Sequence, residues 1–309
     1  MKSQSYKFLI PILISLFLFS CKTSSHNQKK VKESENYIFD NALLWKVEGQ
    51  GLKYPSYIFG TIHLIKDEDF FLPAGFSNAF DQVQEIVFEI DMKQTEDMSL
   101  MMKILPKLMM KGDTTLKDLL TDEDYAILQK RLSKSGIPPF LTDKIKPMFL
   151  SMLGDSDINF ASMQEGKYKS YEMELLQMAK AKNKTTGGLE TIEYQISVMD
   201  SIPYKEQAKM LMEEIKDSEN KESQTQDLIE KYKKQDIQAL YSGIHSDEIS
   251  KYEKILLYNR NKNWIPLMIK FMNEKPVMFA VGAGHLAGKN GILMLLKKKG
   301  YKLIPILTK

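Results

Sequence analysis

The sequence predicts an α/β fold in which strands from both ends of the chain form one mixed sheet and a large helical insertion covers it. Short runs of β-branched and aromatic residues lie near both termini, and helical spacing dominates from about residue 95 to residue 271. The 309 residues, 43% hydrophobic and 27% charged, suit one globular domain or two small ones, and we expect a single domain over 41–309. The chain closes with a predicted β-α-β unit: Val277–Val281, Gly291–Lys299 and Tyr301–Leu307.

The first twenty residues predict export. Lys2 and Lys7 come before an apolar run, Phe8–Ser20, that is shorter than the roughly 20 residues of a membrane span. The run ends in Leu-Phe-Ser-Cys, which resembles the lipobox of bacterial lipoproteins. We therefore expect residues 1–20 to be a signal peptide and the cysteine, Cys21, to carry lipid that anchors the protein to a membrane of the bacterial cell envelope. The alternative is a plain signal peptide with an incidental cysteine.

Cysteine and charge counts narrow the possible chemistry. Cys21 is the only cysteine, which excludes disulfides, cysteine-ligated metals and cysteine nucleophiles. Residues 22–36 are polar and lack apolar periodicity, so we expect the lipidated cysteine and a polar tether to occupy 21–40. The formal net charge is +3, and loss of residues 1–20 removes two lysines and no acid. A mature charge of +1 gives no reason to expect a nucleic acid partner.

The predicted domain begins with a β-hairpin. Leu44–Val47 and Ser56–Phe59 have strand-like composition and flank a turn rich in glycine and proline. A loop over Lys66–Pro73 and a helix around Phe76 should follow. The segment Glu85–Asp91 then reads as a buried strand that ends on acids.

The middle of the chain is predicted to be helical, with one interruption. Thr121 and Ser246 are each followed by acids and are expected to be helix N-caps. Tyr168–Lys182 shows helical spacing, whereas Thr185–Thr191 reads as a β segment that includes an acid. A clear apolar stripe consists of Leu228, Ile229, Tyr232, Ile237, Leu240 and Tyr241. Many of the nineteen methionines lie in this part, either as adaptable core packing or as a groove for apolar peptides.

One short motif occurs twice, at the ends of strands expected near the two termini. Tyr57–Leu64 reads strand-Gly-x-x-His-Leu, and Val277–Leu286 repeats that pattern. The chain has only four histidines, and His63 and His285 occupy matched positions in the two copies. Because glycine lets the backbone turn sharply off a strand, we expect the two histidines to meet in one site.

Four polar residues lie at the ends of predicted β segments, where α/β sheets bind their ligands: His63, Glu89, Glu190 and His285. Two imidazoles and two carboxylates suit a divalent Mn, Co, Fe or Zn ion. Such an ion would lower the pKa of a bound water, and one carboxylate would serve as general base. We expect Arg260 to stabilise an oxyanion or to hold a substrate carboxylate. In the alternative interpretation, the histidines are packing residues and the glutamates are helix caps.

Several motifs, taken in order, resemble those of the TraB/GumN family over nearly all of the chain after the tether. They are Phe59–Leu64, Phe88–Asp91, Gly188–Thr191 followed by Gln195, Arg260-Asn261, and Gly282–Leu286 with Gly300-Tyr301. That family is similar to the animal Tiki proteases and, more distantly, to ChaN and erythromycin-esterase-like proteins. The resemblance implies a ChaN- or esterase-like fold and a metal-dependent hydrolase site. For Tiki-like members it also implies cleavage of a peptide near its amino terminus.

The family pattern, carried over residue by residue, falls on His63, Glu89, Glu190, Arg260 and His285, with Glu172 as a further candidate acid. We therefore expect a lipid-anchored, divalent-metal-dependent peptidase that acts on a peptide or protein. The two histidines would be metal ligands, and Glu89 and Glu190 would be ligand and general base in an order left open. The alternatives are a non-catalytic lipoprotein that binds a peptide, a metal or haem, and an esterase.

Overall fold

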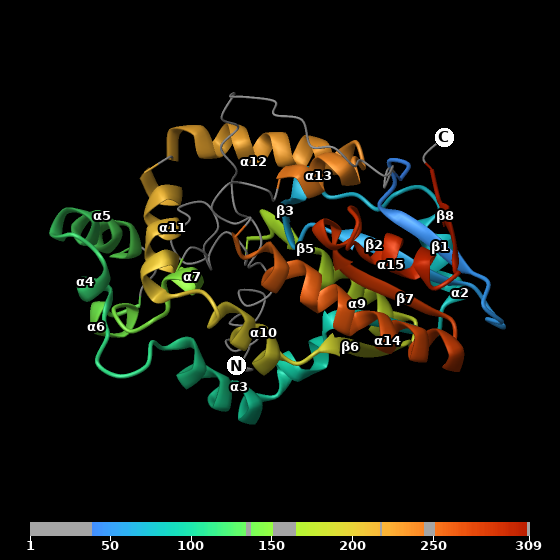
Figure 1. The fold of residues 1–309 in the computed structure, drawn as a ribbon, viewed down its shortest axis with the longest axis horizontal. Helices are drawn as coiled ribbons and strands as arrows, with labels where there is room; N and C mark the ends of the chain where they lie inside the picture. The colour runs from blue at the N-terminus through green and yellow to red at the C-terminus, as the bar shows by residue number, and fades with distance from the viewer. Residues whose placement is uncertain (1–38, 134–136, 151–164, 217, 244–250, 308–309) are drawn as a thin grey trace.

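The computed structural model of the chain describes residues 39–133, 137–150, 165–216, 218–243 and 251–307. Within them, one six-stranded mixed sheet is packed between helices, and a second sheet has two short strands (Figure 1). This confirms the predicted α/β class. The expected signal peptide, Cys21, most of the tether and the Ser246 cap lie outside the described residues. None of the described helices combines the length and apolarity of a membrane span.

The main sheet joins strands from the two ends of the chain in the order β6-β4-β7-β2-β1-β8. Strands β2, β7, β4 and β6 are parallel, whereas β1 pairs antiparallel with both β2 and β8. The predicted hairpin and the closing β-α-β unit are thereby confirmed. The strands are β1 (Leu44–Glu48), β2 (Ser56–Thr61), β4 (Glu85–Ile90), β6 (Thr185–Glu190), β7 (Val277–Gly282) and β8 (Lys302–Pro305).

Helices cover both faces of this sheet. On one face, Phe59 of β2 packs against Phe76 of α2 (Phe76–Gln82) and Tyr171 of α9 (Tyr171–Ala181). On the other face, Phe271 of α14 (Asn259–Glu274) contacts Phe279 of β7, and α15 (Ile292–Lys298) lies beside α14. Every residue of β2, β4 and β7 is buried. Burial on both faces explains why these segments read as continuous apolar runs.

The helical insertion extends from the sheet and has a hydrophobic cluster of its own, which includes Leu116, Leu128 and Leu211 (Figure 1). Its main helices are α3 (Met98–Ile104), α4 (Leu116–Leu119), α5 (Asp122–Leu132), α6 (Pro139–Thr142), α7 (Pro147–Leu150), α10 (Ile192–Met199), α11 (Tyr204–Lys216), α12 (Ser218–Lys233) and α13 (Ile237–Gly243). Short 3-10 turns are η1 (Asp67–Asp69), η2 (Met92–Glu96), η3 (Leu105–Leu108) and η7 (Ala283–His285), and a π-helical turn, η6 (Lys254–Tyr258), runs into α14.

Two segments differ from the prediction because the backbone pairs over a long range. Tyr168–Ser170 was expected to be helical but forms β5, which pairs antiparallel with β3 (Leu64–Lys66). The helix begins at Tyr171, and Ser170 is its N-cap, accepting a hydrogen bond from the backbone N–H of Met173. The segment expected to be a loop after His63 therefore starts with a strand. Strands of three residues are too short to show a period.

Two smaller expectations have mixed outcomes. The Thr121 cap is confirmed, since its hydroxyl accepts a hydrogen bond from the N–H of Asp124 at 3.2 Å.

The methionines do not share one role. Met148 and Met199 lie in a buried cluster, whereas Met98 and Met102 of α3 are 49% and 64% exposed.

Two adjacent glycines on β6 are expected to differ sharply when replaced by alanine. A Cβ at Gly188 would lie 2.4 Å from the backbone nitrogen of Asp91. A Cβ at Gly187 would lie 3.5 Å from the Phe271 ring and 3.7 Å from Oε1 of Glu85, which are ordinary contact distances. Gly188→Ala should therefore separate β6 from β4 and lower the free energy of unfolding by about 1–3 kcal/mol. Gly187→Ala, the matched control, should change it by no more than about 1 kcal/mol. Urea titration followed by circular dichroism measures both, and equal effects would contradict the packing described.

Candidate active site

Six side chains meet at the carboxyl end of the parallel strands. The structure brings together all the residues that the sequence placed in one site: His63, Glu89, Glu172, Glu190, Arg260 and His285. Each imidazole follows the end of its strand, Glu172 lies in the first turn of α9, and Arg260 lies in the first turn of α14. Each of these side chains is almost completely buried.

The His63 ring is oriented by the Glu172 carboxylate. Nδ1 of His63 lies 3.0 Å from Oε1 of Glu172, which also accepts a hydrogen bond from the Thr61 hydroxyl at 2.9 Å. The Ser170 hydroxyl donates to the other oxygen of Glu172 at 3.0 Å. A carboxylate accepts only, so Nδ1 of His63 carries the proton and Nε2 is left for the site. Burial lowers the pKa of His63. The charge and hydrogen bond of Glu172, together with the charge of Glu89, raise it by more, so the net shift of this pKa is upward.

The His285 ring is oriented by an amide instead. Nδ1 of His285 lies 2.6 Å from Oδ1 of Asn261, whose Nδ2 donates to the Asn290 carbonyl at 2.9 Å. Since that oxygen accepts, Nδ1 carries the proton, and Nε2 accepts a hydrogen bond from Nη1 of Arg260 at 3.2 Å. The Trp264 ring packs on the imidazole with centroids 4.5 Å apart. Burial first, and then the Arg260 charge, lower the pKa of His285 to about 3, so this ring is neutral.

Arg260 connects the two acids of neighbouring strands. Its Nη2 donates to Glu89 and to Glu190, both at 2.6 Å, and its Nε donates to Glu190 at 3.0 Å. Glu190 also accepts a hydrogen bond from the indole N–H of Trp264 at 2.9 Å. The guanidinium carbon lies 4.8 Å from the centre of the Trp264 ring. Glu190 therefore contacts the arginine and the indole, whereas Glu89 faces the imidazoles, with 3.8 Å between its Oε1 and Nε2 of His285.

The two acids have opposite pKa shifts. Burial would raise the pKa of Glu89, but Arg260 and the two imidazoles lower it to about 2. Burial raises the pKa of Glu190, and there Arg260 offsets only part of the effect. Glu89 is thus held as a carboxylate at the point where the imidazoles converge.

Gly282 allows three groups to approach one point. A Cβ on this residue would lie 3.3 Å from Oε1 of Glu89, 3.5 Å from Nε2 of His63 and 3.7 Å from Cδ2 of His285. The backbone N–H of Gly282 also donates to Oε1 of Glu89 at 2.8 Å. Any side chain at this position would displace the acid or a ring.

The donor set suits a divalent cation in type and charge. Nε2 of His63 and Oε1 of Glu89 face the point beside Gly282, and Nε2 of His285 lies 3.8 Å from that oxygen. The other nitrogen of each ring is held by a second side chain, as is usual for metal ligands. With both rings neutral, three buried glutamates against Arg260 leave two formal negative charges. Within the described part of the chain, however, no three His, Cys, Asp or Glu side chains form a ready metal-binding group. In addition, Nη1 of Arg260 donates to Nε2 of His285, the ring nitrogen that a cation would need.

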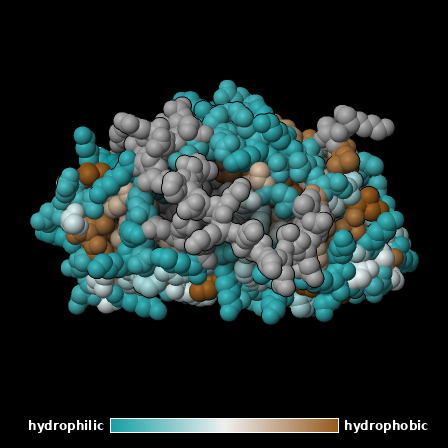
Figure 2. All heavy atoms as spheres, turned by 45° about the horizontal axis from the view of Figure 1, so that its top comes forward, coloured by the Kyte–Doolittle hydropathy of each residue, from teal (hydrophilic) through white to brown (hydrophobic). Residues whose placement is uncertain are grey.

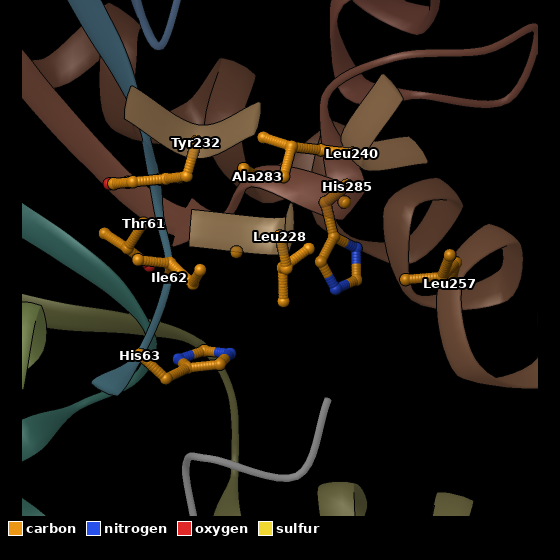
Figure 3. Close-up of a pocket in the computed structure, with 11 residues that line it drawn as sticks. Thr61, Ile62, His63, Leu228, Tyr232, Leu240, Leu257, Ala283 and His285 are labelled. Atoms are coloured by element: carbon orange, nitrogen blue, oxygen red, sulfur yellow. The ribbon is translucent and has the colours of Figure 1, made fainter. Parts of the chain in front are cut away.

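A cavity of about 60 Å³ opens between the two imidazoles (Figure 3). The rings of His63 and His285 point into it from opposite sides. Its described lining consists of Thr61, Ile62, His63, Leu228, Tyr232, Leu240, Leu257, Gly282, Ala283, Gly284 and His285. The leucines come from the predicted apolar stripe and from η6. Figure 2 shows the molecule with the top of Figure 1 turned forward, and hydrophilic residues predominate among the coloured ones on this face.

Three residues that hold the site together were given no role by the sequence analysis. Asn261 orients His285, Trp264 binds Glu190, and Thr61 binds Glu172. For Trp264 the available signal was its spacing from Arg260 on one helix, since a residue four positions on lies on the same face. For Asn261 it was the place beside Arg260 in the family motif. Their partners are far away in sequence, so spacing alone did not identify the contacts.

Comparison with known proteins yields a family and a group of relatives. The model of the TraB/PrgY/gumN family matches residues 43–305. The chain is 21% identical to Metalloprotease TIKI1 of Xenopus tropicalis over 97% of its own length and 68% of that protein. It is 22% identical to Metalloprotease TIKI1 of Homo sapiens, covering 85% of this chain and 61% of the relative. For the Metalloprotease TIKI homolog of Nematostella vectensis, the identity is 23% and the coverage is 84% and 66%. No solved structure matches significantly.

The opposite pKa shifts of the two histidines predict opposite effects of pH on the metal-free protein. His285 has a lowered pKa in the fold, so the unfolded state binds more protons below its ordinary value of 6.5, and stability falls as the pH drops below 6.5. His63 has a raised pKa, so its contribution is fully present below 6.5 and is lost as the pH rises through the folded value.

Urea unfolding in the presence of chelator, between pH 5 and pH 9, tests this. On the acid side, His285→Asn should reduce the slope of the free energy of unfolding against pH by up to about 1.4 kcal/mol per pH unit. On the alkaline side, His63→Asn should make the free energy of unfolding less dependent on pH. Loss of the same slope in both variants would contradict the assignment of the two rings.

Removal of the guanidinium should destabilise the fold strongly. Arg260→Met leaves Glu89 and Glu190 buried without a counter-charge and should lower the free energy of unfolding by about 3–5 kcal/mol. The double variant with Glu190→Gln should lose less than the sum of the single changes, because the two residues are in contact. Lys262→Met, an exposed change on the same helix, is the control and should stay within about 0.5 kcal/mol. Additive losses in the double variant would argue against the pairing.

Proposed function

The chain belongs to the TraB/PrgY/gumN family, and we propose that it is a divalent-metal-dependent peptidase whose site is the cluster around His63 and His285. The observation that carries the proposal is the orientation of the two imidazoles. Each ring donates through Nδ1 to a fixed partner and presents Nε2 to the point beside Glu89. The relatives described as metalloproteases support this reading.

The proposed roles follow from which atoms face that point. His63, His285 and Glu89 would hold the cation, while Glu172 and Asn261 fix the orientation of the rings. A divalent cation supplies a water of lowered pKa and polarises the carbonyl that is attacked. Burial of the cluster strengthens each of these electrostatic contacts.

Arg260 and Glu190 would act one step away from the cation. Glu190 has its hydrogen bonds with Arg260 and Trp264 and is assigned to positioning the guanidinium. Arg260 in turn holds Oε2 of Glu89, which leaves Oε1 of that acid directed at the imidazoles. Its five N–H groups already bond to Glu190, Glu89, the Leu256 carbonyl and His285, so Arg260 is assigned to holding these groups rather than to contacting the substrate.

The proposed location is the bacterial cell envelope, with the protein held at a membrane by lipid on Cys21. The lipobox-like ending of the apolar run at residues 18–21 supports this proposal. The proposed substrate is a peptide or protein, in line with the protease names of the relatives. The chain spans only 61–68% of the length of the three relatives described above, so their substrates are not carried over.

A peptide-binding role without catalysis is the second candidate. It is favoured by one observation: Nη1 of Arg260 donates to the ring nitrogen of His285 that a metal would need. In that role the cluster would be a structural ion network, and the cavity would be the binding site.

Peptide cleavage by the protein without residues 1–21 tests the proposal. A random peptide library, incubated with Mn²⁺, Co²⁺ or Zn²⁺ and read by mass spectrometry, should show cleavage that chelator abolishes. Glu89→Gln should lower kcat/KM by about 10²–10⁴, because the cation would lose its charged ligand and with it several kcal/mol of transition-state stabilisation. Glu85→Gln is the matched control, because Glu85 is also buried and lies at the other end of β4. It should keep activity within a few-fold.

The outcomes separate the two candidates. Turnover that resists chelator would remove the metal from the mechanism. Tight peptide binding without cleavage in any metal would favour the binding protein. Equal losses in Glu89→Gln and Glu85→Gln would mean that both changes act through stability, which would contradict the role given to Glu89.

A further inference from the structure

We propose that the apolar part of the cavity beside the imidazoles is a subsite for a short aliphatic side chain of the substrate, next to the bond that is cleaved. The inference rests on the proposed function, since it names the chemistry of a substrate residue for that same site. Its position supports it: His63 and His285, which would hold the cation, line the cavity together with leucines, so a side chain that packs on the leucines lies beside the reacting group (Figure 3).

The described lining is apolar apart from the two rings. Leu228 comes from α12, Leu240 from α13 and Leu257 from η6, while Ile62 and Ala283 come from the turns after β2 and β7. No lysine, arginine or carboxylate occurs among the described lining residues. A charged group placed among the leucines would lose its hydration without gaining a counter-charge there.

The polar side chains at the border are already engaged. The Thr61 hydroxyl donates to Glu172 at 2.9 Å, and the Tyr232 hydroxyl donates to the Gly60 carbonyl at 2.9 Å. The Nδ1 atoms of both imidazoles are bonded to Glu172 and Asn261. An amide or hydroxyl side chain of the substrate would therefore find few partners here, and leaving its polar atoms unpaired weakens binding.

The volume of the cavity selects the length of the side chain. An apolar cavity of about 150 Å³ accommodates a benzene ring. The cavity here, at about 60 Å³, is less than half as large and has no room for an aromatic ring unless its lining moves. Side chains from alanine to valine fit this space, and larger ones require that a leucine give way.

Chemistry and selectivity would then come from different parts of the chain. The imidazoles follow strands of the sheet, whereas Leu228, Leu240 and Leu257 belong to the helical insertion. Leu228 is partly buried at the wall of the cavity, which makes it the best position for changing the volume without emptying the core. Leu295 of α15 is also partly buried against the same core and does not line the cavity, so it provides a matched control.

The test uses the protein without residues 1–21 and a set of peptides that differ at one residue beside the cleaved bond. Wild type should prefer valine over phenylalanine and over aspartate by about 10- to 200-fold in kcat/KM, the range for a misfit in an apolar pocket. Leu228→Ala should lower the valine-to-phenylalanine ratio by about 10-fold, and Leu228→Phe should move the preference towards alanine and glycine. Leu295→Ala should leave all ratios unchanged.

Binding of the same peptides separates this inference from the peptidase proposal. Fluorescence of Trp264, which packs on His285, reports occupancy in the Trp45→Phe variant, since the chain has two tryptophans. Selective binding of valine peptides without cleavage would support the subsite and overturn the peptidase. Cleavage with no aliphatic preference, or with ratios that Leu228 substitutions do not alter, would overturn the subsite alone. Neither cleavage nor selective binding would overturn both.

Discussion

A single buried guanidinium holds the edge of the sheet together where the candidate site lies. Glu89 and Glu190 end neighbouring parallel strands, and Ile90 of one pairs with Glu190 of the other. Two carboxylates brought so close in a buried site would repel each other. Arg260 donates to both, and its planar fork suits carboxylates better than the compact ammonium of lysine. The position of Glu89, and with it the geometry beside Gly282, depends on this contact.

The two imidazoles are held by partners of different charge, and this difference limits the charge of the whole cluster. His63 is held by the carboxylate of Glu172, whereas His285 is held by the neutral amide of Asn261. A second carboxylate in place of Asn261 would add one more negative charge to a cluster in which three glutamates already face one arginine. A buried ion cluster is weak evidence for stability. The stability of the fold therefore gives little reason for these buried charges, whereas the proposed binding of a cation gives one.

Much of the sheet could be predicted from local patterns, but the contacts within the site could not. The segments Ser56–Thr61 and Val277–Gly282 are buried on both faces and read as continuous apolar runs, and the repeated Gly-x-x-His marked where they end. Pairing of Glu190 with Arg260 depends on β6 lying beside β4, a register that no nearby residue encodes. Leu228 and Leu240 followed a helical stripe that looks the same whether a helix packs on a core or lines a cavity.

The sheet order has a consequence for how the protein is made. Strand β7 lies between β2 and β4, and β8 closes against β1, so the central and the last strands come from the end of the chain. At about 5–20 residues per second, the ribosome takes about 10–45 s to get from His63 to His285. Until then β2 and β4 have unpaired edges, which promote aggregation. Such long-range pairing also slows folding. A nascent chain therefore has an interval in which these edges are exposed, and a product that ends before His285 would lack one of the two imidazoles of the candidate site.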